Sequence, residues 1–170
     1  WWNLYRLVEG PRLEPIAPMD VEFADPAWIF DRSSFGFLPD GSIVAVGRSG
    51  GRDRLFHIRP GEQIGEVESP FTEFDNVRVG SSVVVAIAGA PSEAAAIVTM
   101  DPATFGPKGV LRRSTATSFD AAVISVPESI AFPTSGERVA HALYYAPANP
   151  ATVGPDDERP PLVVRTHGGP

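Results

Sequence analysis

A pair of short apolar strands that occurs twice constrains this chain more than any other feature. Residues 42–46 and 54–58 are rich in the β-branched and aromatic side chains that favour strands. The same order recurs at residues 82–86 and 96–100, so the first strand starts again 40 residues later and the second ends 42 residues later. Repeats of about 40–50 residues in an all-strand sequence are typical of β-propeller blades, each of which is a four-stranded sheet.

Other segments extend this pattern. Turns rich in small and polar residues are predicted over residues 47–53 and 88–93, and residues 3–7 resemble the second strand of the repeat. The nearest candidate for a helix, residues 92–100, ends in β-branched side chains that favour a strand. We therefore predict only strands and turns over residues 3–113, arranged as successive antiparallel sheets. Their outer strands are expected at residues 35–38, 76–79 and 110–112.

The last part of the sequence has a different pattern. Residues 129–132 and 138–145 are predicted to form paired antiparallel strands, and residues 146–160 an exposed connection. An apolar run over residues 162–166 follows, and it ends in the glycine turn of residues 167–170, His-Gly-Gly-Pro. This order is typical of a buried strand that delivers a turn at its carboxyl end, where open α/β sheets build their active sites.

Four segments of this region together resemble the prolyl oligopeptidase family of serine peptidases, particularly its acylaminoacyl-peptidase and dipeptidyl-peptidase branches. They are residues 126–136, residues 139–147, the Pro160-Pro161-Leu162 run and the terminal His-Gly-Gly-Pro. One departure is Arg165, a charge in a strand that is usually apolar in this family.

The resemblance implies a mainly β chain in which residues 1–122 are C-terminal blades of a β-propeller and residues 123–170 are the first strands of an α/β-hydrolase domain. It further implies a parent enzyme that cleaves peptide or acyl-amino bonds of short peptides. Its Ser-His-Asp triad would lie downstream, so the chain alone would be inactive. Gly168 and Gly169 are the candidate oxyanion-hole N–H donors, because glycine permits close approach of the substrate to the backbone. His167 is expected to support the turn structurally.

Two other classes of function fit parts of the sequence. A carboxylesterase or lipase uses the same glycine turn, although such enzymes rarely follow a propeller. A propeller that only binds a partner would lack the downstream serine elbow followed by Asp and His. The downstream sequence and the substrate preference therefore separate the three classes.

Other candidate catalytic residues have plainer interpretations. The run from Gly47 to Gly51 matches the G-x-S-x-G nucleophile elbow around Ser49, but an elbow precedes a helix and this run precedes a strand. We therefore predict a hairpin turn at Ser49. His57 and His141 lie in predicted strands, and no motif places an acid or a nucleophile beside them, so both are predicted to be structural.

Composition narrows the classes of ligand. The net charge of −7 and the scattered 14 basic residues argue against a nucleic-acid or anionic-membrane surface. No cysteine is present, and no histidines or carboxylates have metal-ligand spacing, so neither a metal nor a cofactor is predicted. The Asp156-Asp157-Glu158 run is expected to be a solvated loop. The expected partners are a short peptide or acylated-peptide substrate and the rest of the parent chain, and an oligomer is compatible with the sequence.

Overall fold

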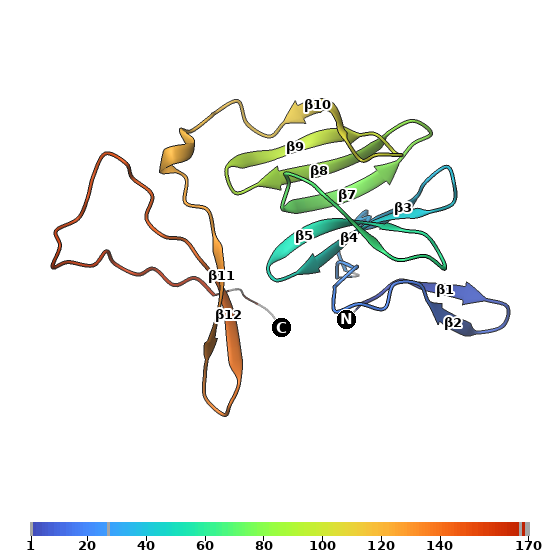
Figure 1. The fold of residues 1–170 in the computed structure, drawn as a ribbon, viewed down its shortest axis with the longest axis horizontal. Helices are drawn as coiled ribbons and strands as arrows, with labels where there is room; N and C mark the ends of the chain where they lie inside the picture. Colours follow the sequence, from blue (N-terminus) through green and yellow to red (C-terminus); the bar gives the residue numbers. More distant parts are fainter. Residues whose placement is uncertain (1, 27, 167, 169–170) are drawn as a thin grey trace. The chain divides into compact units, whose positions relative to one another are not determined.

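The computed structural model describes residues 2–26, 28–166 and 168, and the chain forms two compact units that meet in sequence between Ser118 and Phe119 (Figure 1). The chain is mainly β. The only helical element in the described residues is the short 3-10 helix η1 (Ala121–Val123). Within this described part, no helix has the length and apolar character needed to cross a membrane.

The first unit contains a hairpin and two four-stranded antiparallel sheets whose strands follow chain order. The hairpin pairs β1 (Tyr5–Val8) with β2 (Arg12–Pro15). The first sheet consists of β3 (Phe35–Phe37), β4 (Ile43–Ser49), β5 (Arg52–Ile58) and β6 (Gly65–Val67). The second consists of β7 (Glu73–Val79), β8 (Val84–Ala90), β9 (Glu93–Met100) and β10 (Pro107–Arg113). The prediction of strands and turns alone is confirmed for the described residues of this region.

The two strand pairs of the repeat are the central hairpins β4–β5 and β8–β9, but their turns are shorter than predicted. Ser49 pairs with Arg52, which leaves a two-residue turn at Gly50-Gly51. Both glycines have positive φ, 61° and 77°, as a type I′ hairpin turn requires. The predicted turn over residues 47–53 is therefore too long. The pairing of β4 with β5 continues as far as Ser49 and Arg52, so most of these residues belong to the two strands.

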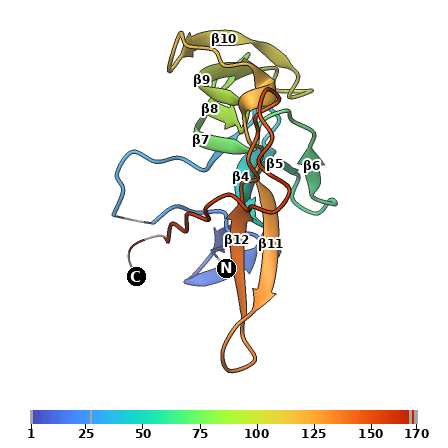
Figure 2. The ribbon, with the colours of Figure 1, turned by 90° about the vertical axis from the view of Figure 1, so that its left-hand side faces the viewer.

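Alternating side chains of β4 bury both faces of the first sheet. Val44 and Val46 belong to the apolar cluster that the sheet shares with β7, β8 and β9, while Ile43 and Ala45 belong to a second cluster on the opposite face. The segment before β3 covers that opposite face, and Phe23 packs edge-on against Phe56 with ring centroids 5.4 Å apart. Sheet-on-sheet packing therefore holds the first unit together, and Figure 2 shows its strands from the side.

The second unit pairs β11 (Glu128–Pro133) with β12 (Val139–Tyr144) in antiparallel register, as predicted. The strand predicted over residues 162–166 is wrong. These residues form no strand, and Leu162, Val163 and Val164 are 76%, 87% and 74% exposed. A strand needs a neighbour for its backbone hydrogen bonds, and in the described residues of this unit β11 and β12 pair only with each other.

Gly47 is fixed by close packing. A Cβ at this position would lie 2.4 Å from Val21 Cγ1 and 2.7 Å from Phe56 Cε2, and Val21 and Phe56 are buried. We expect Gly47→Ala to lower the free energy of unfolding by about 1–3 kcal/mol, as overpacking of a core does. Urea denaturation measures this change. Gly65→Ala, in a strand position with room for a Cβ, should have a much smaller effect, and equal losses for both variants would contradict the packing argument.

Candidate functional site

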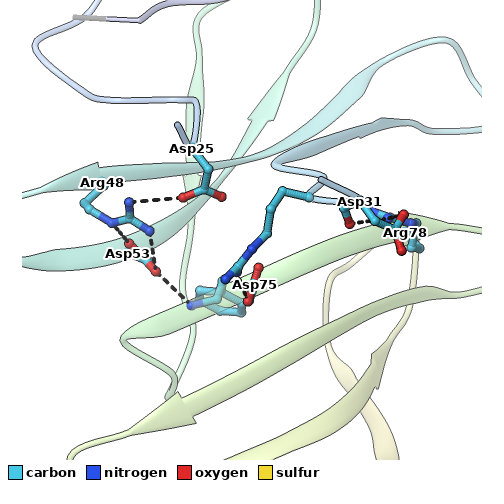
Figure 3. A network of polar contacts seen from close by, with 8 residues as sticks. Asp25, Asp31, Arg48, Asp53, Asp75 and Arg78 are labelled. Atoms are coloured by element: carbon cyan, nitrogen blue, oxygen red, sulfur yellow. Dashed lines mark hydrogen bonds and ion pairs between the residues drawn. The ribbon is translucent and has the colours of Figure 1, made fainter. Parts of the chain in front are cut away.

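A network of charged side chains lies where the segment before β3 meets β4, β5 and β7 (Figure 3). Arg48 donates from Nε to Asp53 Oδ1 at 2.7 Å and from Nη1 to Asp25 Oδ1 at 3.4 Å. The other oxygen of Asp53 accepts the backbone N–H of Phe74 at 3.0 Å. Asp53 is buried, so these bonds compensate the cost of removing its charge from water. The carboxylate thereby connects the first sheet to the second.

Two further ion pairs link the β2–β3 connection to β7. Arg32 Nη1 donates to Asp75 Oδ2, and Arg78 Nη2 donates to Asp31 Oδ1 at 3.2 Å and to the Asp31 carbonyl at 3.1 Å. Hydrogen bonding to their aspartate partners raises the pKa of both Arg32 and Arg48. The guanidinium groups therefore stay charged at any working pH. With the four aspartates and three arginines ionised, the network has one excess negative charge.

A small cavity lies beside this network. Asp25, Arg48, Asp75 and Asn76 contribute to its wall, and its volume, about 10 Å³, is enough for one water-sized group. Asn76 lies in a β-bulge of β7 with φ 51°, where the register to β8 shifts. Its Oδ1 atom is buried and has no hydrogen-bond partner among the described residues. This acceptor is therefore buried without a hydrogen bond from the described residues.

His57 on β5 has polar partners that the sequence did not indicate. Its Nε2 lies 2.8 Å from Ser42 Oγ, and Ser42 Oγ also lies 2.5 Å from Asp40 Oδ1. A catalytic triad has its acid on the imidazole Nδ1 and an accessible nucleophile, whereas here the acid holds the serine, and Ser42 is buried. These three residues fit a structural role, because their hydrogen bonds connect the β3–β4 turn to β5.

The structure places the other predicted site residues as follows. Ser49 ends β4 at the Gly50-Gly51 turn and is followed by β5, so the prediction of a hairpin at this position is confirmed. His141 is exposed on β12, opposite Ala131.

The glycine turn is only partly within the described residues. Gly168 is exposed, and a Cβ there would meet nothing within 4 Å. His167 and Gly169 lie outside the described residues, so the oxyanion-hole assignment stays a prediction. Among the described residues, no group of three His, Asp or Glu side chains could hold a metal ion.

Comparison with solved structures finds a puromycin-hydrolysing peptidase of Mycobacterium tuberculosis with a TM-score of 0.86 and 28% sequence identity, over 95% of this chain and 25% of that chain. The chain is similar to puromycin-hydrolysing peptidases. A puromycin hydrolase matches with a TM-score of 0.83, and a serine-to-alanine mutant of puromycin hydrolase complexed with PGG matches at 0.82. Both are 28% identical over 95% of this chain and 24% of theirs. No protein-family model and no curated protein matches the chain.

The chain thus spans about a quarter of the length of these structures. These neighbours are described as a peptidase and hydrolases, in agreement with the resemblance seen in the sequence. The similarity does not distinguish the acylaminoacyl-peptidase branch from the dipeptidyl-peptidase branch.

The environment of His57 predicts a pH dependence of stability. Burial lowers the pKa of His57 below the usual histidine value of about 6.5. The unfolded chain therefore binds this proton more readily, so the contribution of His57 to stability is complete above about pH 6.5 and decreases as the pH falls below it.

We expect His57→Gln, which stays neutral, to lose less stability than the wild type between pH 7.5 and pH 5.5 in urea denaturation. His141→Gln serves as the control, since that histidine is exposed. An identical pH dependence for wild type and His57→Gln would contradict the argument.

Proposed function

We propose that this chain is part of a serine peptidase of the prolyl oligopeptidase family. Residues 1–122 would come from its β-propeller and residues 123–170 from the beginning of its α/β-hydrolase domain. The observation that carries this proposal is the match to a puromycin-hydrolysing peptidase over 95% of the chain, which includes residues of both units, with a TM-score of 0.86. The two four-stranded antiparallel sheets in chain order also support it, since propeller blades are sheets of this kind.

The proposed substrates are short peptides, acylated peptides and aminoacyl amides. Puromycin contains an amide bond between an aromatic amino acid and an aminonucleoside, so its hydrolysis is a peptidase reaction. In the proposed mechanism a downstream serine attacks the carbonyl carbon, and a downstream histidine, oriented by an acid, accepts the serine proton and then donates it to the leaving amine.

The glycine turn is the part of this mechanism that the chain itself would supply. The tetrahedral intermediate carries a negative charge on the former carbonyl oxygen, and preorganised backbone N–H groups stabilise that charge. In our proposal one donor comes from Gly168 or Gly169.

A substrate panel tests the reaction class on the complete protein. We expect hydrolysis of puromycin and of aminoacyl or N-acylaminoacyl 4-nitroanilides with higher kcat/KM than hydrolysis of p-nitrophenyl esters of long acyl chains. The reason is that the acyl site of a peptidase recognises an aminoacyl group, whereas that of a lipase or carboxylesterase accommodates a long acyl chain. Preference for the long-chain esters would identify a carboxylesterase or lipase, and absence of all turnover would identify a propeller that only binds a partner.

Alanine variants of the glycine turn test the oxyanion assignment. At the donating glycine a Cβ would tilt the N–H and crowd the acyl group, so Gly168→Ala or Gly169→Ala should lower kcat about a hundredfold or more. Ser49→Ala is the control, since Ser49 ends β4 beside a hairpin turn, and it should keep wild-type kcat. Circular dichroism must show that each variant is folded. Wild-type kcat in both folded glycine variants would contradict the assignment.

A further inference from the structure

The outer strand of the first sheet is shorter than that of the second. β6 is the edge strand of the first sheet (Figure 2), and it pairs with β5 only over residues 55–57. In the second sheet, β10 pairs with β9 over residues 96–100, and the Ser114 N–H then donates to the Ala95 carbonyl at 3.0 Å. The first residues of β5 therefore lack the outer partner that β9 has.

Asp53 is the residue at which the two sheets differ. β5 ends at Ile58 and β9 ends at Met100, 42 residues later. In this register Asp53 is equivalent to Ala95. The Asp53 N–H donates to the Thr72 carbonyl at 2.9 Å, so the backbone of Asp53 points away from β4. No donor among the described residues reaches the Asp53 carbonyl, whereas the Ala95 carbonyl accepts a hydrogen bond.

A groove of about 680 Å³ lies along this part of β5. Residues 52–54 form one wall, and residues 66–72 of β6 and the β6–β7 connection form the other. Ligand sites in proteins commonly have volumes of about 300–1,000 Å³. The groove therefore has room for a short extended segment, in the place that an outer strand takes in the second sheet.

The charges of the groove favour a single carboxylate. Arg52 is exposed and has no ion pair or hydrogen bond within the described part of the chain. Arg54 has an ion pair with Glu66 at 3.5 Å. A guanidinium group presents paired N–H donors that match a carboxylate, whereas Glu68 in the opposite wall repels a second negative charge. An acidic residue with uncharged neighbours is therefore complementary to the groove.

We propose that this groove binds a free peptide in extended conformation, as a short additional strand beside β5. One peptide N–H donates to the Asp53 carbonyl, and an acidic side chain of the adjacent peptide residue pairs with Arg52. Residues opposite each other in an antiparallel pair have their side chains on the same face, so a peptide residue opposite Arg52 lies on its face. Val67, Pro70 and Phe71 provide apolar contacts for the flanking side chains.

Strand addition of this kind obtains affinity from the main chain and specificity from side chains. The inference goes beyond the proposed peptidase function and does not depend on it, because binding can be measured without turnover.

Calorimetry of the complete protein with blocked peptides tests the proposal. The probes are the N-acetylated amide of Val-Glu-Val-Thr and its counterparts with Gln or Lys in place of Glu, in the presence of phenylmethylsulfonyl fluoride to prevent turnover. The Glu peptide should bind about twofold to fivefold more tightly than the Gln peptide, the range for an exposed ion pair. N-methylation of the one amide that donates to Asp53 should weaken binding about twofold to tenfold, and N-methylation of the adjacent amides should have little effect.

Variants of Arg52 test the charge pair. Arg52→Gln should remove the preference for the Glu peptide, and Arg52→Glu should reverse it in favour of the Lys peptide. Both variants should fold, since Arg52 is exposed, and an unchanged Tm verifies this. Arg59→Gln is the matched control. Arg59 is also exposed, directly after β5, but it does not line the groove, so the preference should persist.

The outcomes separate this inference from the proposed function. Absence of binding at millimolar peptide would overturn the inference, and it is the result expected if another part of the parent chain fills the groove. Equal Kd values for the Glu and Gln peptides, or equal effects of Arg52→Gln and Arg59→Gln, would also overturn it, as would N-methylation without effect at every position. A protein that hydrolyses peptides but fails these tests keeps the proposed function, and one that passes them without hydrolysing any peptide keeps only the inference.

Discussion

The first sheet of this chain has two apolar faces, and the sheet cannot bury either of them by itself. Because side chains alternate along β4, Val44 and Val46 need a partner on one side while Ile43 and Ala45 need one on the other. The second sheet covers one face and the segment before β3 covers the other. This requirement determines the rest of the unit. The stability of each sheet depends on the sheet packed against it, and the segment before β3 must run across the face that it buries.

Buried charge makes this stacking specific. Burial of apolar surface is not directional, whereas Asp53 must keep both Arg48 and the Phe74 N–H or remain buried without compensation. Only one position of the second sheet relative to the first places the Phe74 N–H at that carboxylate. The ion pairs of Arg32 and Arg78 connect the β2–β3 loop to β7, and they favour the same arrangement of the two sheets.

The sequence predicted what depends on local patterns. Runs of β-branched and aromatic residues that recur about 40 residues apart located β4, β5, β8 and β9, and strand context identified the hairpin at Ser49 despite its resemblance to a nucleophile elbow. In that run Gly47 serves core packing and Gly50-Gly51 serve the turn. Two short strands, β2 and β6, were not predicted, because their residues are largely polar or small and their pairing depends on the backbone of the preceding strand.

Contacts between distant residues could not be predicted in this way. Asp53 and Phe74 are 21 residues apart, and Arg78 and Asp31 are 47 apart, so their proximity follows from how the sheets stack. Ser42 and His57 meet only because β4 and β5 pair in one particular register. The strand expected over residues 162–166 shows the opposite error. Apolar residues there favour a strand, but a strand forms only where a neighbouring strand accepts and donates its backbone hydrogen bonds.

The ion pairs of Asp31 and Arg32 have a consequence for cooperativity. They attach a loop of the first sheet to β7 of the second, so local opening of the second sheet would release the loop and its exposed aromatic residues. The conformation of that loop is therefore stable only while the first and second sheets are both folded and in contact. By linkage, whatever binds the ordered loop also raises the free energy needed to separate the two sheets. Any binding to the ordered loop and the nearest-neighbour coupling between the two sheets would thus depend on the same ion pairs.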